Sequence, residues 1–251
     1  KLMNITLKLK IYFMKKKYLI FGATGSIGSS LVNQLYKDEL DCHLVGRNED
    51  ELKKISEKLN YTHSVCDVLK IDFINNLKKD LNETEILGIA YCVGSIDIKP
   101  FRLTKAKDFV SSYVLNLVSV TEILRTFQDS LNKNKGSVVL FSTVAAKKGF
   151  TNHSIISSAK AGVEGLTVSL AAELAPNIRI NCIAPSLTKS KIASSVIKNS
   201  SIEESIAKMH PLKRIGEGVD SANLANFLLT SKSSWITGQV IAVDGGRSSI
   251  A

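Results

Sequence analysis

The fold of this chain is decided by the stretch Tyr18-Leu19-Ile20-Phe21-Gly22-Ala23-Thr24-Gly25-Ser26-Ile27-Gly28. Its first four residues are an apolar run that predicts a strand, and the glycines that follow predict a tight turn. Beyond the turn, Leu31 and Leu35 recur at helical spacing, which predicts a helix over residues 26–37. Because free N–H groups at a helix N-terminus attract anions, such a strand, turn and helix can bind the pyrophosphate of a dinucleotide. The same pattern also occurs as a simple turn, so this segment alone leaves both interpretations open.

A second predicted strand, residues 42–46, is followed directly by Arg47. In a dinucleotide-binding fold this position lies beside the adenosine ribose. An acidic side chain there would accept hydrogen bonds from the ribose of NAD, whereas an arginine accommodates the 2′-phosphate of NADP. Arg47 therefore favours NADP, and an exposed loop arginine is the alternative. A third predicted strand, residues 61–66, ends before Asp67, which either lies beside the adenine with Val68 or caps the next helix.

From Lys17 to the C-terminus the chain resembles the short-chain dehydrogenase/reductase family. The resemblance implies one α/β domain over residues 17–251, with a Rossmann-type, doubly wound parallel sheet of about seven strands in the order 3-2-1-4-5-6-7. The alternation of strands and helices agrees with a parallel sheet, and 251 residues with 44% hydrophobic content can form one core. The residues that the resemblance assigns to the cofactor, NADP with NAD also possible, are Gly22, Thr24, Gly25, Ser26, Ile27, Gly28, Arg47, Asn48, Asp67, Val68, Val93, Gly94, Lys160, Pro185, Thr188 and Ser190.

Three further positions match catalytic positions of the family. Asn116 fits the mid-helix asparagine that holds a water between the catalytic lysine and solvent, and a structural asparagine is the alternative. Thr143 stands where the family has the serine that orients the substrate carbonyl, while Ser142 would point to the opposite face of its strand. Lys160 matches the lysine that binds the nicotinamide ribose and lowers the pKa of the catalytic tyrosine.

The catalytic tyrosine itself is missing, because Ile156 stands four residues before Lys160. Hydride delivery to a carbonyl leaves an alkoxide that must receive a proton, and general acid catalysis typically contributes about 10²- to 10⁴-fold. His153 lies three residues before Ile156, and imidazole ordinarily titrates at about pH 6.5, which suits this role. We therefore predict His153 or a bound water as the proton donor. A loop histidine or a neighbour of the helix cap is the alternative.

The C-terminal part returns to the family pattern. Residues 178–185 predict a sixth strand, after which Ser186 replaces the usual glycine. The resemblance places the backbone of Thr188 at the nicotinamide carboxamide, with Ser190 supporting it. The polar segment 191–210 is expected to form a movable substrate lid. A helix is predicted from about residue 219 to 229, and a last strand within residues 235–246, which in the family contributes to a subunit interface.

The net charge of +10 is concentrated near the N-terminus. The first seventeen residues contain six lysines and no acid, and the remaining chain carries only +4. Residues 1–16 are predicted to be a basic leader, either disordered or a remnant that precedes a natural start at Met14. A membrane-surface tether or a nucleic-acid-binding tail is the less favoured interpretation, and no segment approaches the roughly 20 apolar residues of a membrane span.

The four cysteines are widely spaced and follow no zinc or redox pattern, so we expect reduced thiols, no metal site and a cytoplasmic location. The leading functional hypothesis is an NADP-dependent oxidoreductase that interconverts a carbonyl and an alcohol on a small molecule. The alternative is an inert NADP-binding protein, acting as a sensor or as a partner in an oligomer. A homotetramer or a dimer is expected from the resemblance.

Overall fold

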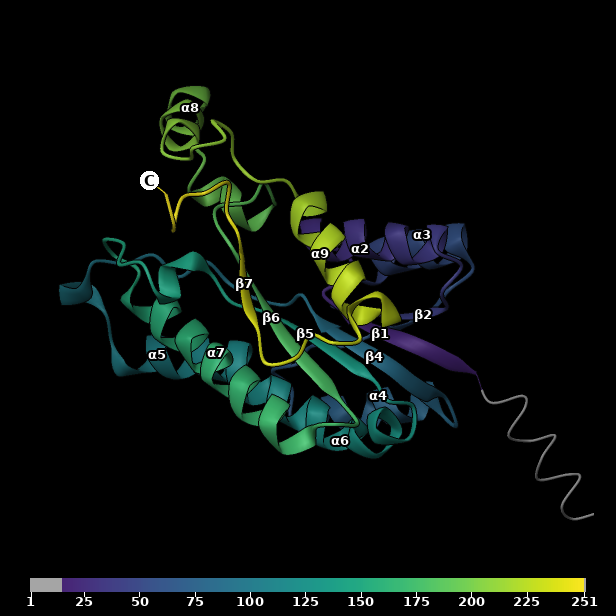
Figure 1. Ribbon diagram of the computed structural model, residues 1–251. Coiled ribbons are helices and arrows are strands. Elements are labelled where there is room, and N and C mark those ends of the chain that lie inside the picture. Colours follow the sequence, from purple (N-terminus) through teal and green to yellow (C-terminus); the bar gives the residue numbers. More distant parts are fainter. Residues whose placement is uncertain (1–14, 251) are drawn as a thin grey trace, which may run out of the picture.

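The computed structural model describes residues 15–250 and contains one seven-stranded sheet, ordered β3-β2-β1-β4-β5-β6-β7 (Figure 1). The strands are β1 (Lys16–Phe21), β2 (Cys42–Gly46), β3 (Thr62–Val65), β4 (Glu85–Tyr91), β5 (Ser137–Phe141), β6 (Arg179–Pro185) and β7 (Val240–Val243). Every neighbouring pair is parallel. The predicted fold class and strand order are therefore confirmed.

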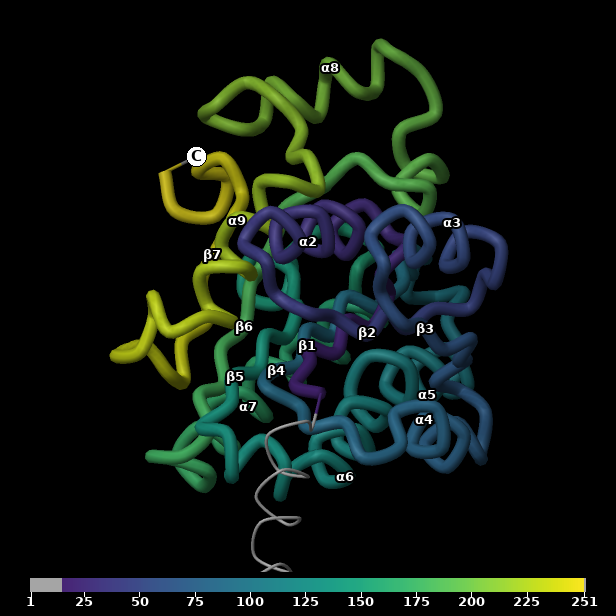
Figure 2. Tube along the Cα trace, turned by 90° about the vertical axis from the view of Figure 1, so that its right-hand side faces the viewer, coloured from purple at the N-terminus to yellow at the C-terminus, as the bar shows by residue number. Residues whose placement is uncertain are grey.

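Helices cover both faces of the sheet. The helix α8 (Ser200–Lys208) lies away from both faces, beyond the carboxyl ends of the strands (Figures 1 and 2). One face carries α2 (Ser26–Lys37), α3 (Glu49–Leu59) and α9 (Gly218–Leu229), and the other carries α4 (Phe73–Leu81), α5 (Ala106–Tyr113), α6 (Ser119–Lys133) and α7 (Ser154–Leu174). The shorter helices are η1 (Phe101–Leu103), the π-helix η2 (Val114–Val118), η3 (Val144–Ala146), η4 (Ile192–Ser195) and η5 (Ser231–Ser233). No helix within residues 15–250 is long and apolar enough to cross a membrane.

Side chains of the central strand alternate between two apolar cores. Leu19 and Phe21 pack beneath α4, α6 and α7, whereas Tyr18 and Ile20 pack beneath α2, α3 and α9. Both faces of the sheet are buried, which explains why its strands read as nearly continuous apolar runs.

Several strand ends differ from the sequence predictions. The last strand covers only β7, and just before it the side chains of Thr237 and Asn181 accept from the backbone N–H groups of Ile180 and Gln239, at 3.1 Å each. The third strand is limited to β3, and β1 begins at Lys16, one residue before the predicted start of the domain. Residues 1–14 of the predicted leader lie outside the described residues.

A directed chain of hydrogen bonds crosses β1, β2 and β3 away from the site. Lys17 donates to Thr62, and the two ring nitrogens of His43 contact the hydroxyls of Thr62 and Ser64 at 2.8 Å each. Ser64 donates in turn to the carboxylate of Asp80 at 2.6 Å. Lysine only donates and a carboxylate only accepts, so a neutral His43 accepts from Thr62 and donates to Ser64. Burial lowers the pKa of His43 to about 4.

Acidification from pH 7 to pH 4 should therefore remove up to about 3 kcal/mol of unfolding free energy through His43. The unfolded ring binds a proton below its ordinary pKa of 6.5, whereas the folded ring stays neutral until about 4. This contribution is complete above pH 6.5 and is lost as the pH falls. Urea unfolding at several pH values should show a shallower pH dependence for His43→Gln than for the wild type. An unchanged slope would contradict the assignment.

Candidate functional site

A cavity of about 850 Å³ opens at the carboxyl ends of the strands, where the strand order reverses between β1 and β4. The predicted site residues that line it are Gly22, Thr24, Gly25, Ser26, Ile27, Arg47, Asn48, Asp67, Val68, Val93, Gly94, Thr143, His153, Lys160, Pro185, Thr188 and Ser190. Gly28 and Asn116 do not line it. One space thus brings together segments that are far apart in the sequence.

The glycine turn brings the start of α2 close to the ends of β1 and β4. Gly22 has a φ of +71°, and a Cβ there would lie 2.9 Å from the backbone of Cys92. Gly28 acts in packing, because its Cβ would lie 2.2 Å from the carbonyl oxygen of Gly22. The N-cap residue of α2 is Gly25, which has no capping side chain, and the first helical turn holds no acid. The free N–H groups of this turn fit a pyrophosphate.

The predicted ribose end of the cavity is formed by the turn after β2. Arg47 is exposed and lines the cavity. Asn48 also lines it, and its side chain caps α3 by accepting from the backbone N–H of Glu51 at 3.0 Å. Asp67 accepts from the N–H of Leu69 at 3.1 Å, in the loop before α4. The alternative role of Asp67 as a helix cap is wrong, because α4 begins six residues later.

Lys160 is buried at the other end of the cavity. Its side chain is 6% exposed, and its Nζ donates to the carbonyl oxygen of Phe141 at 2.8 Å. Burial lowers the pKa of this ammonium group to about 8, because the charged form loses its hydration. Gly94 lies directly beside it, since a Cβ on Gly94 would be 3.4 Å from Lys160 Nζ.

Asn116 lies behind Gly94, within the π-helix η2. Its amide nitrogen donates to the carbonyl oxygen of Ser112 at 2.8 Å, while its buried Oδ1 has no partner among the described residues. A Cβ on Gly94 would lie 3.4 Å from that oxygen, so the unpaired acceptor and Lys160 Nζ face the same small region. An unpaired buried acceptor indicates a place for a water or a ligand hydroxyl. π-Helical turns are often found at functional sites, and this one turns around Asn116.

Thr143 and Ser142 follow β5 and have different partners. Thr143 is half-buried, lines the cavity and accepts from the N–H of Ala145 at 3.3 Å. The Ser142 hydroxyl donates to the buried carboxylate of Glu164 at 2.8 Å. The Ser142 hydroxyl therefore has a partner in the protein interior, and the Thr143 hydroxyl is the one of the two that can reach a ligand in the cavity.

His153 and Ile156 occupy the start of α7 and both line the cavity. Nδ1 of His153 lies 2.7 Å from the carbonyl oxygen of Thr151, which can only accept, so Nδ1 carries the hydrogen and Nε2 remains available. His153 is the N-cap residue of α7, as the alternative interpretation allowed, and its side chain makes no capping hydrogen bond to the helix. Ile156 is 6% exposed and lies one helical turn before Lys160, on the same face of α7.

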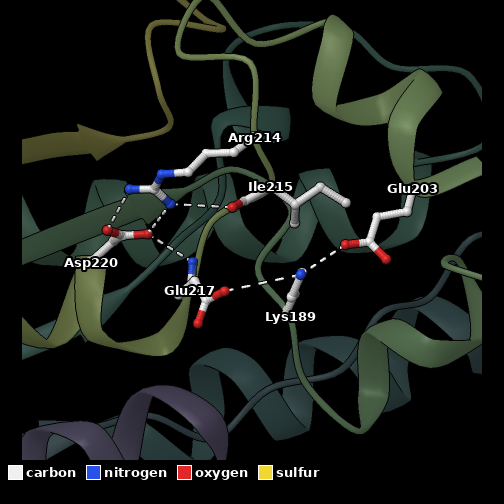
Figure 3. Close-up of polar contacts among 6 residues, drawn as sticks. All are labelled: Lys189, Glu203, Arg214, Ile215, Glu217 and Asp220. Carbon is white, nitrogen blue, oxygen red and sulfur yellow. Dashed lines mark hydrogen bonds and ion pairs between the residues drawn. The ribbon is translucent and has the colours of Figure 1, made fainter. Parts of the chain in front are cut away.

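The predicted lid covers one side of the cavity with η4 and α8. Its base is held by charges, as Figure 3 shows: Lys189 pairs with Glu203 of α8 at 2.8 Å and lies 4.0 Å from Glu217, the N-cap of α9. Arg214 binds both carboxylate oxygens of Asp220, at 2.6 and 2.7 Å (Figure 3). The Lys189–Glu217 and Arg214–Asp220 pairs join the residues that flank the lid segment to the start of α9. Motion of the lid stays a prediction.

A further ion pair joins the lid to the cofactor side of the cavity. Lys191, just before η4, contacts Glu51 of α3, and both residues line the cavity. The wall also contains Phe150 and Arg247, which the sequence analysis did not identify. In the sequence, the one feature that marks Arg247 is its position directly after Gly245 and Gly246. Within residues 15–250, no group of histidines, cysteines and acids is arranged to hold a metal ion.

The arrangement suits hydride chemistry on a small molecule. An anion-binding turn and an exposed arginine lie at one end, and a buried ammonium group, a threonine hydroxyl and an imidazole lie at the other. The unpaired Asn116 oxygen and the uncapped α2 turn are observations that fit a bound dinucleotide. Ile156, which stands where the resemblance predicts the proton donor, is apolar.

A family model described as enoyl-(acyl carrier protein) reductase matches residues 22–248. A chloroplastic tropinone reductase homolog of Arabidopsis thaliana is 33% identical over 240 residues, which cover 92% of this chain and 74% of the relative. The 3-oxoacyl-[acyl-carrier-protein] reductase FabG of Rickettsia bellii is 32% identical over 236 residues, covering 91% of this chain and 95% of FabG.

Among solved structures, ElxO with NADP bound superposes with a TM-score of 0.84 and 26% identity, covering 93% of this chain and 99% of ElxO. A tyrosine-to-phenylalanine variant of ElxO, with NADPH bound, superposes with a TM-score of 0.82. The family model spans most of the described residues, and the curated relatives align over nearly the whole chain. The chain therefore belongs to the short-chain dehydrogenase/reductase family.

Proposed function

We propose that the protein is an NADP-dependent oxidoreductase that interconverts a carbonyl and an alcohol on a small molecule. The observation that carries the proposal is the single cavity that joins the glycine turn and Arg47 to Lys160, Thr143 and His153. The reductase relatives, FabG among them, and the ElxO structures with NADP and NADPH bound support the same chemistry.

Each residue has a separate role in the proposed mechanism. Bound NADPH would supply the hydride. The uncapped turn of α2 and Arg47 hold the phosphate groups, and Lys160 binds the ribose hydroxyls beside the reaction centre. The Thr143 hydroxyl donates to the carbonyl oxygen of the substrate and orients it. Asn116 holds a water on its unpaired oxygen, close to Lys160 Nζ.

His153 supplies the proton in this mechanism. As an imidazolium, it donates through Nδ1 to the Thr151 carbonyl and keeps the Nε2 hydrogen for the substrate oxygen. After proton transfer, the neutral ring retains the same Nδ1 bond. The Thr151 carbonyl therefore fixes the ring in both states, so His153 acts as an acid in reduction and as a base in oxidation.

One observation favours the alternative of an inert NADP-binding protein: the residue one helical turn before Lys160, where the resemblance predicts the catalytic tyrosine, is the apolar Ile156. NADPH binding does not separate the two functions, because both need the same phosphate and ribose contacts. Turnover does separate them. NADPH consumption should be measured against ketones, diketones and 3-oxoacyl thioesters, with NADPH binding followed in parallel by fluorescence. Consumption that depends on a carbonyl compound supports the proposal, whereas binding without any consumption supports the inert protein.

Arg47→Ala should weaken NADPH binding about 10-fold or more and leave NADH binding nearly unchanged. A charge-assisted contact to the 2′-phosphate is made only by NADPH, and it contributes more than an ordinary hydrogen bond. The matched control is Lys54→Ala, which removes an exposed positive charge from the adjacent α3. Dissociation constants from NADPH and NADH fluorescence titrations give the measurement. Equal losses for both cofactors would contradict the role of Arg47.

We also propose that the protein self-associates as a dimer or a tetramer. The exposed large apolar side chains include Val110 of α5, Val168 of α7 and, before β7, Trp235, which is 99% exposed. Exposed apolar side chains of this kind are typical of subunit interfaces. A cytoplasmic location remains a prediction, and all four cysteines are free thiols in the structure.

A further inference from the structure

Arg247 occupies the cavity wall at the end opposite Arg47. It follows β7 in the C-terminal turn, and it lines the cavity together with Phe150, His153 and Met209. Its guanidinium carbon lies 4.7 Å from the centre of the Phe150 ring, and the Phe150 ring lies 5.5 Å from the His153 ring. Phe150 thus separates a permanent positive charge from the imidazole of the proposed reaction centre.

The backbone around Arg247 is held rigidly. The carboxylate of Asp244 accepts from the N–H groups of Gly246 and Ser248, at 2.9 and 2.7 Å, which closes the turn. Lys148 Nζ donates to the carbonyl oxygen of Arg247 at 2.7 Å, which joins this turn to the loop after β5. Figure 1 shows the C-terminal turn between α8 and the loops that precede α7. This held backbone and the stacking on Phe150 limit the positions that the guanidinium can take, which favours binding.

No ion pair within residues 15–250 neutralises the charge of Arg247. The only polar contact that its side chain makes there is with the sulfur of Met209, at 3.5 Å. The nearest acid in sequence, Asp244, is occupied by its turn. Partial burial lowers the pKa of the Arg247 guanidinium from its ordinary value, because the charge loses hydration, and the charge of Asp244 offsets only part of this effect. An unpaired, half-buried guanidinium in a cavity wall lacks the acceptor that its planar N–H groups match.

The other cations near this part of the cavity already have partners. Lys147 pairs with Glu164 at 3.6 Å, and Lys191 pairs with Glu51. Lys160 donates to the Phe141 carbonyl and lies at the proposed ribose position. Arg247 is thus the cation of this wall whose charge is left for a ligand.

We propose that Arg247 binds a carboxylate on the substrate, so that the enzyme acts on oxo acids and the corresponding hydroxy acids. This inference rests on the proposed oxidoreductase function. The carboxylate lies on the guanidinium, the chain of the substrate passes along the Phe150 ring, and the carbonyl lies at Thr143 and His153. A planar carboxylate matches the planar fork of one guanidinium with two parallel hydrogen bonds.

The test compares acids with their neutral esters. Reduction of pyruvate, acetoacetate and levulinate is measured beside that of their methyl esters, for the wild type, Arg247→Gln, Arg247→Lys and the control Arg102→Gln. Arg102 is exposed and does not line the cavity, so its variant removes the same charge elsewhere. We expect Arg247→Gln to lower kcat/KM for the preferred acid about 10- to 100-fold and to leave its ester nearly unchanged. Arg247→Lys should restore part of the loss, and Arg102→Gln should change neither.

Binding provides a readout that does not depend on turnover. Calorimetric titration of the protein–NADP⁺ complex with succinate and with succinamide should show a preference for the carboxylate that disappears in Arg247→Gln. If no carbonyl compound is reduced but this preference is present, the proposed function fails and the carboxylate site stands. If acids and esters are reduced equally well in the wild type and in Arg247→Gln, the carboxylate site is overturned and the oxidoreductase stands. An equal loss in Arg102→Gln would also overturn it.

Discussion

His153→Ala should lower kcat for carbonyl reduction about 100-fold or more, with little change in NADPH affinity. In the proposed mechanism the imidazole donates the proton that the substrate oxygen needs, and loss of a general acid typically costs about 10²- to 10⁴-fold. His153 lines the cavity at the substrate end, away from Arg47 and the glycine turn, so cofactor binding should survive. Steady-state kinetics and NADPH fluorescence titration give the two quantities.

The matched control is His63→Ala, which removes a histidine from β3, outside the cavity wall. It should leave kcat unchanged. His153→Gln gives a further comparison, because glutamine keeps a polar side chain at this position and cannot act as the acid. Turnover that persists unchanged in both His153 variants would assign the proton to water or to another group.

A change in the rate-limiting step could hide the loss of the acid. NADPH deuterated at the transferred position distinguishes the two cases, because hydride transfer then shows a primary isotope effect on kcat. If His153 acts as proposed, the isotope effect on kcat should grow, or stay large, as the chemical step slows in His153→Ala. A variant that is slow with no isotope effect would point to altered substrate or product binding instead.

The fold could be predicted because its signals are local. The apolar run before Gly22, the glycine turn and the helical spacing after it are visible in one short stretch, and the strand order followed from the family resemblance. The extent of the last strand could not be predicted, because it depends on contacts between Thr237, Asn181 and backbone groups of the neighbouring strand. Such contacts join residues that are more than fifty positions apart.

Site residues could be predicted where they directly follow a strand or belong to a motif. They could not be predicted where the site depends on contacts between loops that are distant in the sequence. Arg47 and Lys160 were identified from their positions after a strand and within a motif. Arg247 was not, because its meaning depends on Phe150 in another loop and on the absence of a carboxylate partner among the described residues. The π-helical turn around Asn116 likewise depends on how this segment packs against α7.

Ile156→Tyr in the His153→Ala background should restore reduction at least about 10-fold. Residue 156 lies one helical turn before Lys160 on the same face of α7 and lines the cavity, so the larger ring has open space before it. The buried ammonium group of Lys160 favours the ionised form of a nearby phenol, which lowers the tyrosine pKa and makes the hydroxyl a better acid. The restored rate should be measured with the same substrate and cofactor as the His153→Ala rate.

The control for this gain is Ile156→Phe in the same background, which adds the ring without the hydroxyl. Restoration by tyrosine and not by phenylalanine would show that the cavity geometry supports hydride transfer and that the proton is what His153→Ala removed. Equal rates for the two variants would show that ring packing, not acid catalysis, controls turnover. If the wild type reduces no carbonyl compound and Ile156→Tyr alone is active, the cavity still positions cofactor and substrate for hydride transfer. Ile156 then accounts for the missing reaction, and the natural protein binds the nucleotide without turning over a substrate.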